Sequence, residues 1–265
     1  MCFSFFYTLQ LTTKNKRMKR LAVKILLAWV LLLFCENLAI GQTDSISNGF
    51  SLVKTMYAQN SQNWYNNLTF KQEVFRVKDD SIVSREVWIL AYSSPSKLHI
   101  RYSDFDSGRG WLIVTDSIYT YNNFNLIGSR LRIHELMVLG LDIYNVLPQI
   151  SVERIKQLGI DISRVEMVTI KGKSLYQIGN PETICFWVHT INLLFYGLRK
   201  VNESGDVKDT FFEQYKTLYG KPVATEVQYF LNGKMFIFER YSEIRFPTFL
   251  HNDLFVPARF KDVMW

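Results

Sequence analysis

The sequence predicts a mainly β protein of the α+β class: a meandering antiparallel sheet of about ten or eleven strands, with an N-terminal helix and one helical insertion. Three observations favour this fold. Apolar and polar residues alternate with a period of two over most of the chain after residue 67. The alternating runs are short and end at Asp, Ser, Gly, Pro or Asn. Neither βαβ alternation nor a repeat of 20–50 residues is found.

The first predicted element is a short amphipathic helix. Apolar side chains recur at spacings of three and four residues at Phe50, Val53, Met56 and Tyr57. Asp44, Ser47 or Asn48 could cap its N-terminus.

Strands and turns follow in a regular order. The first group of strands is predicted at 68–77, 85–92, 97–102, 111–114 and 118–121. Short helices are predicted at 134–139 and 143–147, and another turn of helix within 152–158. Strands resume at 165–170 and 175–178, with one or two between 185 and 200, and then at 224–231 and 235–241. Asn232-Gly233 predicts a type I′ hairpin turn between the last two, and 244–260 docks as a final strand or loop.

Residues 1–41 predict a secretory signal peptide with an upstream extension. Basic residues around Lys19 and Arg20 precede an apolar run from Ile25 to Phe34, and Ala39-Ile40-Gly41 has the small-x-small form of a cleavage site. Glu36 interrupts the apolar stretch, which is too short for a spanning helix. We therefore expect a periplasmic protein whose single domain covers residues 42–265.

The formal net charge of +7 does not indicate a nucleic-acid binder. Residues 1–41 hold six of the basic residues and one acid, which leaves 25 basic and 23 acidic residues in the remainder. A nucleic-acid-binding domain usually carries its basic excess on the folded part. We expect no nucleic-acid partner and a monomer.

Several predicted strands are apolar on both faces, which is unusual for a sheet with one side in water. Trp88, Leu90 and Tyr92 share one face of their strand, and Leu98, Ile100 and Tyr102 are in phase on the next. Such residues suit either a hollow that admits an apolar ligand or the filled core of an ordinary sandwich. Aromatic residues line apolar pockets well because their polar tips reach hydrogen-bond partners.

Motifs for catalysis and metal binding were not found. G-x-S-x-G, G-x-G-x-x-G, P-loop and C-x-x-C sequences do not occur. His134-Glu135 begins like a zinc-protease helix, but Val138 stands where the second histidine belongs. Asp79-Asp80 and the pair Asp104 and Asp106 lie in polar turn segments. We expect no catalytic residues, no metal and no cofactor, although a hydrolase with a triad from distant segments remains an alternative.

Four stretches, in this order, resemble the LolA-like family of periplasmic outer-membrane lipoprotein carriers, and most of all the lipoprotein-sorting proteins of Bacteroidetes-type bacteria. They are Phe70-Lys71-Gln72-Glu73-Val74, the strand from Pro95 to Tyr102, the hairpin from Leu112 to Asn122, and Tyr219-Gly220-Lys221-Pro222 with the hairpin at Asn232-Gly233. The carriers often have an arginine before the proline, where it hydrogen-bonds the lid, whereas this chain has Ser94. Ser117 stands where the family usually has glycine.

The resemblance implies an open antiparallel half-barrel whose helical insertion forms a lid over an apolar cavity. The expected cavity residues are Trp88, Leu90, Tyr92, Leu98, Ile100, Tyr102, Ile113, Tyr119 and Tyr121. The expected lid residues are Leu136, Leu139, Tyr144 and Leu147. The implied partners are a lipid or acylated lipoprotein cargo and transfer partners at the inner and outer membranes.

The sequence leaves two functions of this fold open. The first is a carrier or binder of acyl chains in envelope lipoprotein sorting. The second is a periplasmic sensor or envelope-assembly module that binds a protein and no lipid, because a fold does not determine function.

Overall fold

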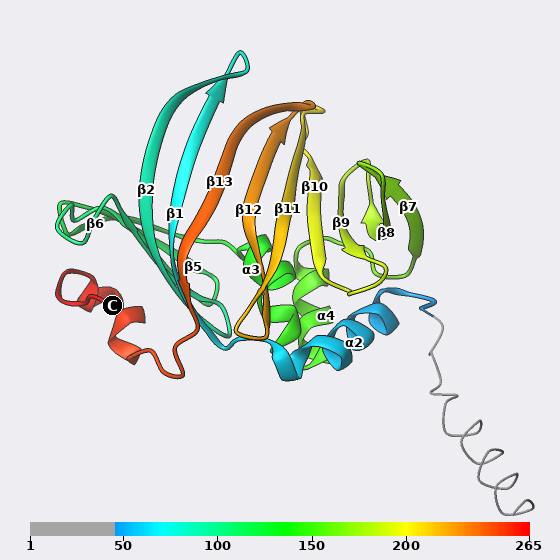
Figure 1. Ribbon diagram of the computed structural model, residues 1–265, viewed down its shortest axis with the longest axis horizontal. Helices are drawn as coiled ribbons and strands as arrows, with labels where there is room; N and C mark the ends of the chain where they lie inside the picture. The colour runs from blue at the N-terminus through cyan, green and yellow to red at the C-terminus, as the bar shows by residue number, and fades with distance from the viewer. Residues whose placement is uncertain (1–45) are drawn as a thin grey trace, which may run out of the picture. The chain divides into compact units, whose positions relative to one another are not determined.

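The computed structural model describes residues 46–265, which form one compact unit (Figure 1). The predicted signal peptide, its cleavage site after Gly41 and the candidate cap Asp44 lie outside the described residues. The mainly β class, the open sheet and the N-terminal helix are confirmed, but the sheet has 13 strands instead of ten or eleven.

The strands form one antiparallel sheet in the order β6-β5-β4-β3-β2-β1-β13-β12-β11-β10-β9-β8-β7. The first six are β1 (Asn67–Lys78), β2 (Ser81–Ser93), β3 (Lys97–Tyr102), β4 (Gly110–Val114), β5 (Ser117–Asn122) and β6 (Asn125–Leu131). The others are β7 (Val165–Ile170), β8 (Lys173–Asn180), β9 (Ile184–His189), β10 (Phe195–Val201), β11 (Val207–Leu218), β12 (Lys221–Leu231) and β13 (Lys234–Arg245). β6 and β11 were not among the predicted strands.

The sheet consists of two meanders that meet where β1 pairs with β13. Each meander is built from hairpins between consecutive strands, as the short turns in the sequence predict. The turn at Asn232-Gly233 has φ values of 50° and 79°, which fits the predicted type I′ geometry. β6 and β7 are the two edges of the sheet and do not pair with each other, so the sheet stays open.

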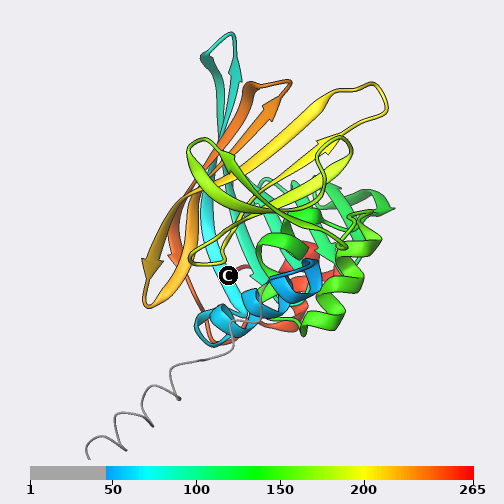
Figure 2. The same ribbon diagram turned by 90° about the vertical axis from the view of Figure 1, so that its right-hand side faces the viewer.

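The helical insertion connects these two edges. It comprises α3 (Glu135–Gly140), the 3₁₀ helix η2 (Asp142–Tyr144) and α4 (Pro148–Gln157). Because the chain must pass from β6 to β7, the insertion crosses the concave side of the curved sheet (Figures 1 and 2). α4 begins at Pro148, a residue that suits the first turn of a helix, and so starts before the helical turn that was predicted within 152–158.

The first helix, α2 (Gly49–Asn60), packs against α4 and η2. Of the three candidate caps, Asn48 is the one used: its Oδ1 accepts from the Ser51 backbone N–H at 2.9 Å, and Ser51 Oγ accepts from the Asn48 N–H at 3.1 Å. A short 3₁₀ helix, η1 (Ser61–Asn63), then leads to β1.

The largest core lies between the helices and the concave face of the sheet. Leu52, Val53 and Met56 of α2 are fully buried in this core. Phe186 and Phe195, from β9 and β10, are equally buried on the sheet side. Burial of this many apolar side chains, at about 1.5–3 kcal/mol each relative to exposure, fixes the helices on this face.

The C-terminal tail covers the opposite, convex face over β3, β4 and β5. It contains two 3₁₀ helices, η3 (Asn252–Phe255) and η4 (Pro257–Asp262), so the predicted alternative of a final strand is wrong. Phe260 stacks on Tyr121 with ring centroids 3.7 Å apart and lies 3.7 Å from the Arg101 guanidinium carbon. His99 donates from Nδ1 to the Leu254 carbonyl at 2.7 Å. These strands are apolar on both faces because each face has a covering layer.

Candidate functional site

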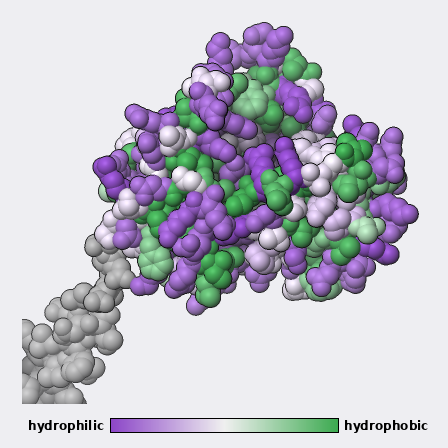
Figure 3. Space-filling model, turned by 180° about the vertical axis from the view of Figure 1, so that it is seen from behind, coloured by the Kyte–Doolittle hydropathy of each residue, from purple (hydrophilic) through white to green (hydrophobic). Residues whose placement is uncertain are grey.

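A cavity of about 150 Å³ lies on the concave face, between the sheet and the segment His134–Leu141. Its wall combines both meanders: strands β1 to β4 on one side and β11 to β13 on the other. Nearly all lining side chains are aliphatic or aromatic, and the polar exceptions are Gln72, His134, Glu239 and tyrosine hydroxyls. The outer surface seen from behind is a mixture of hydrophilic and hydrophobic residues (Figure 3).

Five of the nine expected cavity residues line this cavity: Trp88, Leu90, Tyr92, Leu98 and Ile100. The β2–β3 register explains their grouping. Leu90 pairs with Ile100 and Tyr92 pairs with Leu98, so all of these side chains project from the same face.

Two further expected residues lie in the same apolar core without lining the cavity. Tyr102 packs beside Trp88, with ring centroids 4.7 Å apart, and beside Trp111 at 6.0 Å. Ile113 is fully buried in the concave core.

Tyr119 and Tyr121 were assigned to the cavity, and this placement is wrong. Ile118 of β5 belongs to the concave core, so the alternating neighbours Tyr119 and Tyr121 point to the convex face. There the Tyr121 hydroxyl donates to the Pro257 carbonyl at 2.9 Å, and the C-terminal tail covers both rings.

The four expected lid residues have different places. Leu136 lines the cavity. Leu139 and Tyr144 are fully buried in the core behind it, where the Tyr144 hydroxyl accepts from the Phe195 N–H at 2.7 Å and donates to the Leu193 carbonyl at 3.1 Å. Leu147 stands at the N-cap position of α4 and is 56% exposed, so its assignment as an inward lid residue is wrong.

The half of the wall that comes from β11, β12 and β13 was not predicted from the sequence. The missed lining residues of these strands are Phe212, Tyr215, Val223, Ala224, Tyr229, Glu239 and Tyr241. Alternation within the predicted hairpin indicates that Val227 and Tyr229 share a face. It does not indicate that this face meets β2 and β3 across the β1–β13 pairing.

Glu239 is the most unusual group in the cavity wall. It is 7% exposed, and its Oε2 accepts hydrogen bonds from Tyr229 at 3.2 Å and Tyr241 at 3.3 Å. Burial raises the pKa of this carboxyl to about 7, against the opposing effect of the two hydroxyls and of the Lys208 charge. Burial also lowers the pKa of His134 to about 4, so the imidazole is neutral at pH 7.

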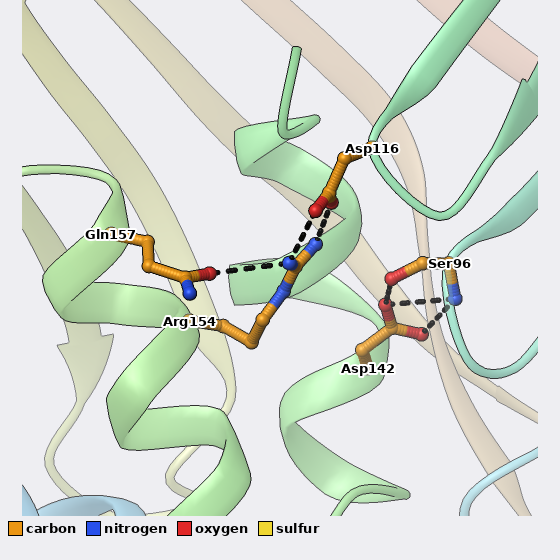
Figure 4. Close-up of polar contacts among 5 residues, drawn as sticks. All are labelled: Ser96, Asp116, Asp142, Arg154 and Gln157. Atoms are coloured by element: carbon orange, nitrogen blue, oxygen red, sulfur yellow. Dashed lines mark hydrogen bonds and ion pairs between the residues drawn. The ribbon is translucent and has the colours of Figure 1, made fainter. Parts of the chain in front are cut away.

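Asp142 of η2 ties the helical insertion to the β2–β3 turn. Its carboxylate accepts from the Ser96 N–H at 3.0 Å and the Ser96 hydroxyl at 2.7 Å (Figure 4). It also accepts from the Tyr92 hydroxyl at 2.5 Å. The Ser94 hydroxyl lies 3.5 Å from Oδ1. Burial raises the pKa of Asp142, while these hydrogen bonds act in the opposite direction. We call this group the Asp142 latch.

Ion pairs tether the insertion at two other places. Arg154 of α4 binds both oxygens of Asp116 in the β4–β5 turn and reaches Gln157 Oε1 at 3.2 Å (Figure 4). At the start of α3, Glu135 accepts from Lys200 of β10 at 2.5 Å and from Arg132 at 3.0 Å. Burial opposes ionisation of Glu135, but these cations lower its pKa to about 2.

Within residues 46–265, the residue types that bind metals do not gather in groups of three or more. Burial raises the pKa of the Cys185 thiol to about 12, which makes it a poor nucleophile. In the same part of the chain, none of the helices has the length and apolar character needed to span a membrane.

The site is thus an apolar hollow in an open antiparallel half-barrel, closed by a helical insertion. This is the LolA-like fold, as the sequence resemblance predicted. Neither a protein-family model nor a curated protein matches the sequence.

Solved structures match the fold at low sequence identity. A DUF1329 family protein from Desulfovibrio piger has a TM-score of 0.54 and 11% identity, over 80% of this chain and 97% of that one. A domain named for outer-membrane lipoprotein sorting, from Vibrio parahaemolyticus, has a TM-score of 0.53 and 14% identity, over 80% and 98%. A LolA superfamily protein from Nitrosomonas europaea has a TM-score of 0.52 and 10% identity, over 77% and 97%.

Proposed function

We propose that the protein is a periplasmic carrier or binder of the acyl chains of lipoproteins or related lipids, and that it acts in envelope lipoprotein sorting. The observation that carries the proposal is the cavity, whose wall is mainly apolar and is built by both meanders and α3. The fold shared with a domain named for outer-membrane lipoprotein sorting supports the same function. The predicted signal peptide supports the location.

The energetics of the cavity favour an aliphatic ligand. Each methylene group that leaves water for an apolar site contributes about 0.8 kcal/mol. An apolar wall offers little to a charged or strongly polar molecule, which would lose its hydration without replacement. A chain of several methylene groups therefore binds through the sum of small, non-directional contributions to the free energy of transfer from water.

The insertion has to move for a long chain to enter. The cavity holds about 150 Å³, whereas ligand pockets usually measure about 300–1,000 Å³. Leu136, Met137 and Leu141 occupy the side of the hollow nearest the insertion. We propose that these side chains and the acyl chain compete for the same space, which keeps binding reversible.

The small volume of the cavity also favours a second candidate function, that of a periplasmic sensor or envelope-assembly module on the same fold. In that case α3 stays in place over the cavity, no ligand enters, and the protein functions through a surface that contacts another protein. Neither function requires catalysis, a cofactor or nucleic acid, and we propose that the protein acts as a monomer without enzymatic activity.

A lipid-extraction experiment separates the two functions. The full chain is expressed with its export segment in a Gram-negative host and purified without detergent from the periplasm, and its organic extract is analysed by mass spectrometry. A carrier or binder yields acyl-containing molecules at a stoichiometry near one per protein. An extract without acyl chains, together with a stable protein complex on pull-down, contradicts the carrier function and supports the second candidate.

A further inference from the structure

The apolar cavity has a polar end that the binding of hydrocarbon alone does not use. Gln72 and Glu239 both line the cavity, and they are only 4% and 7% exposed. In the β1–β13 ladder Gln72 stands opposite Tyr241, whose hydroxyl donates to Glu239. Two polar side chains from adjacent strands therefore share one end of an otherwise apolar cavity.

The hydrogen-bonding capacity of this end is not used up by the described residues. Both tyrosine hydroxyls donate to the same oxygen of Glu239, Oε2, and no hydrogen bond to Oε1 occurs within residues 46–265. In the same range, the Gln72 side chain makes no hydrogen bond. These atoms of Gln72 and Glu239 are not among the fully shielded, unpartnered side-chain atoms of the described residues, so they remain open to the cavity and accessible to a ligand.

The carboxyl of Glu239 also lacks a counterion at close range. In the part of the chain that the structure describes, none of the ion pairs includes Glu239. The charge of Lys208 in β11 lowers the pKa of Glu239, but its ammonium lies over the rings of Tyr229 and Phe236, 5.7 Å from each centroid. His134 lines the same cavity but is neutral at pH 7, so it supplies no charge.

We propose that Gln72 and Glu239 form a headgroup subsite that binds an N–H donor at the polar end of an acyl or alkyl chain. The inference rests on the proposed function, because the chain of the same ligand fills the apolar remainder of the cavity. Glu239 Oε1 accepts the hydrogen bond from the ligand N–H. The Gln72 amide, which can both donate and accept, binds the adjoining carbonyl.

The subsite gives the cavity a preference that an apolar wall lacks. A carboxylate accepts hydrogen bonds about twice as strongly as a neutral carbonyl does, and more so away from water. A ligand with an ester oxygen in place of the N–H leaves the Glu239 oxygen without a partner and places two acceptors against each other. The protein therefore selects amide-headed chains over ester-headed chains of the same length.

Two matched ligands test this selection. N-dodecylacetamide and dodecyl acetate differ only in one atom group, N–H against oxygen. Their affinities for the delipidated protein are measured by calorimetry at pH 8, with each ligand kept below its aggregation limit. We expect the amide to bind about tenfold more tightly, equivalent to about 1.4 kcal/mol.

Variants test whether the preference for the amide over the ester arises from Gln72 and Glu239. Glu239→Gln should reduce the amide-to-ester ratio to about twofold or less while the ester affinity changes little. Glu243→Gln, the same substitution at an exposed position of β13 outside this cavity, should keep the wild-type ratio. Gln72→Leu should also reduce the amide-to-ester ratio, and this second test does not depend on whether the Glu239 variant folds.

The outcomes distinguish the two proposals. Equal affinities of the wild-type protein for the two ligands, or an unchanged ratio in Glu239→Gln, overturn the headgroup subsite and leave acyl binding intact. Absence of binding of both ligands to the wild-type protein overturns the proposed function and the subsite together.

Discussion

The Tyr92 hydroxyl of β2 donates a hydrogen bond of 2.5 Å to Asp142 Oδ1, and this bond joins the cavity wall to the helical insertion. Tyr92 lines the cavity with its ring, while Asp142 belongs to η2. In the carriers that the sequence resembles, an arginine before the proline bonds the lid. Here Ser94 holds that position. The hydrogen bonds run in the same direction, because an arginine can only donate, but the charge now lies on the acceptor in the insertion instead of on the donor in the sheet.

The Asp142 latch should control how readily the insertion moves. Asp142→Ala removes the acceptor for Tyr92 and Ser96, so we expect a loss of about 1–3 kcal/mol in the free energy of unfolding and severalfold faster ligand uptake. Urea unfolding and stopped-flow mixing with dodecyl acetate measure these effects. Asp161→Ala, at an exposed turn residue bonded only to Ser163, is the control. An uptake rate equal to that of the wild type would show that the latch does not limit entry.

Glu239 should make stability depend on pH in a defined window. Its pKa is about 7 in the folded protein and 4.5 when unperturbed, so between these values the folded state keeps a proton that the unfolded state releases. The free energy of unfolding therefore decreases as pH rises from about 4.5 to 7, by an amount on the order of 3 kcal/mol.

Glu239→Gln should abolish that contribution. The unfolding free energies of the variant and the wild type are measured by urea denaturation from pH 5 to pH 8. Taking their difference cancels the contributions of the buried histidines, which both proteins share. We expect the difference to shift in favour of the variant as pH rises, whereas Glu243→Gln should show no such trend. A difference independent of pH would contradict an ionisable, buried Glu239.

The C-terminal tail should contribute to stability through Phe260. This ring is 1% exposed and stacks on Tyr121 and His99, with centroids 3.7 Å and 4.9 Å away. Phe260→Ala should lower the free energy of unfolding by about 3–5 kcal/mol, as for other large-to-small core substitutions. Phe249→Ala, at a residue 68% exposed, should change it by less than about 0.5 kcal/mol. A small effect at Phe260 would mean that the tail is not an integral layer.

Local signals in the sequence predicted the elements that depend on neighbouring residues. Asn48 and the apolar spacing that follows it predicted α2, and Asn232-Gly233 predicted the β12–β13 hairpin. The in-phase residues of β2 and β3 were grouped correctly because antiparallel neighbours joined by a short turn share their faces.

The rest depends on contacts between distant segments. Every residue of β6 is exposed, so this strand has no apolar alternation to reveal it. Alternation showed that Tyr119 and Tyr121 share a face, but only the tail, more than 130 residues later, makes that face a buried one on the convex side. Glu239 could not be recognised as a cavity group, since its burial depends on strands from both meanders.

The central claim, that the concave cavity is the place where an acyl chain binds, is tested most directly by filling it. Ala224 lines the cavity and is 5% exposed, so Ala224→Leu places three more carbon atoms in the hollow, whereas Ala258→Leu makes the same change on an exposed residue of η4. Calorimetric titration with dodecyl acetate should show an affinity at least tenfold weaker in Ala224→Leu and unchanged in Ala258→Leu. Equal affinities in the wild type and both folded variants would contradict binding in this cavity.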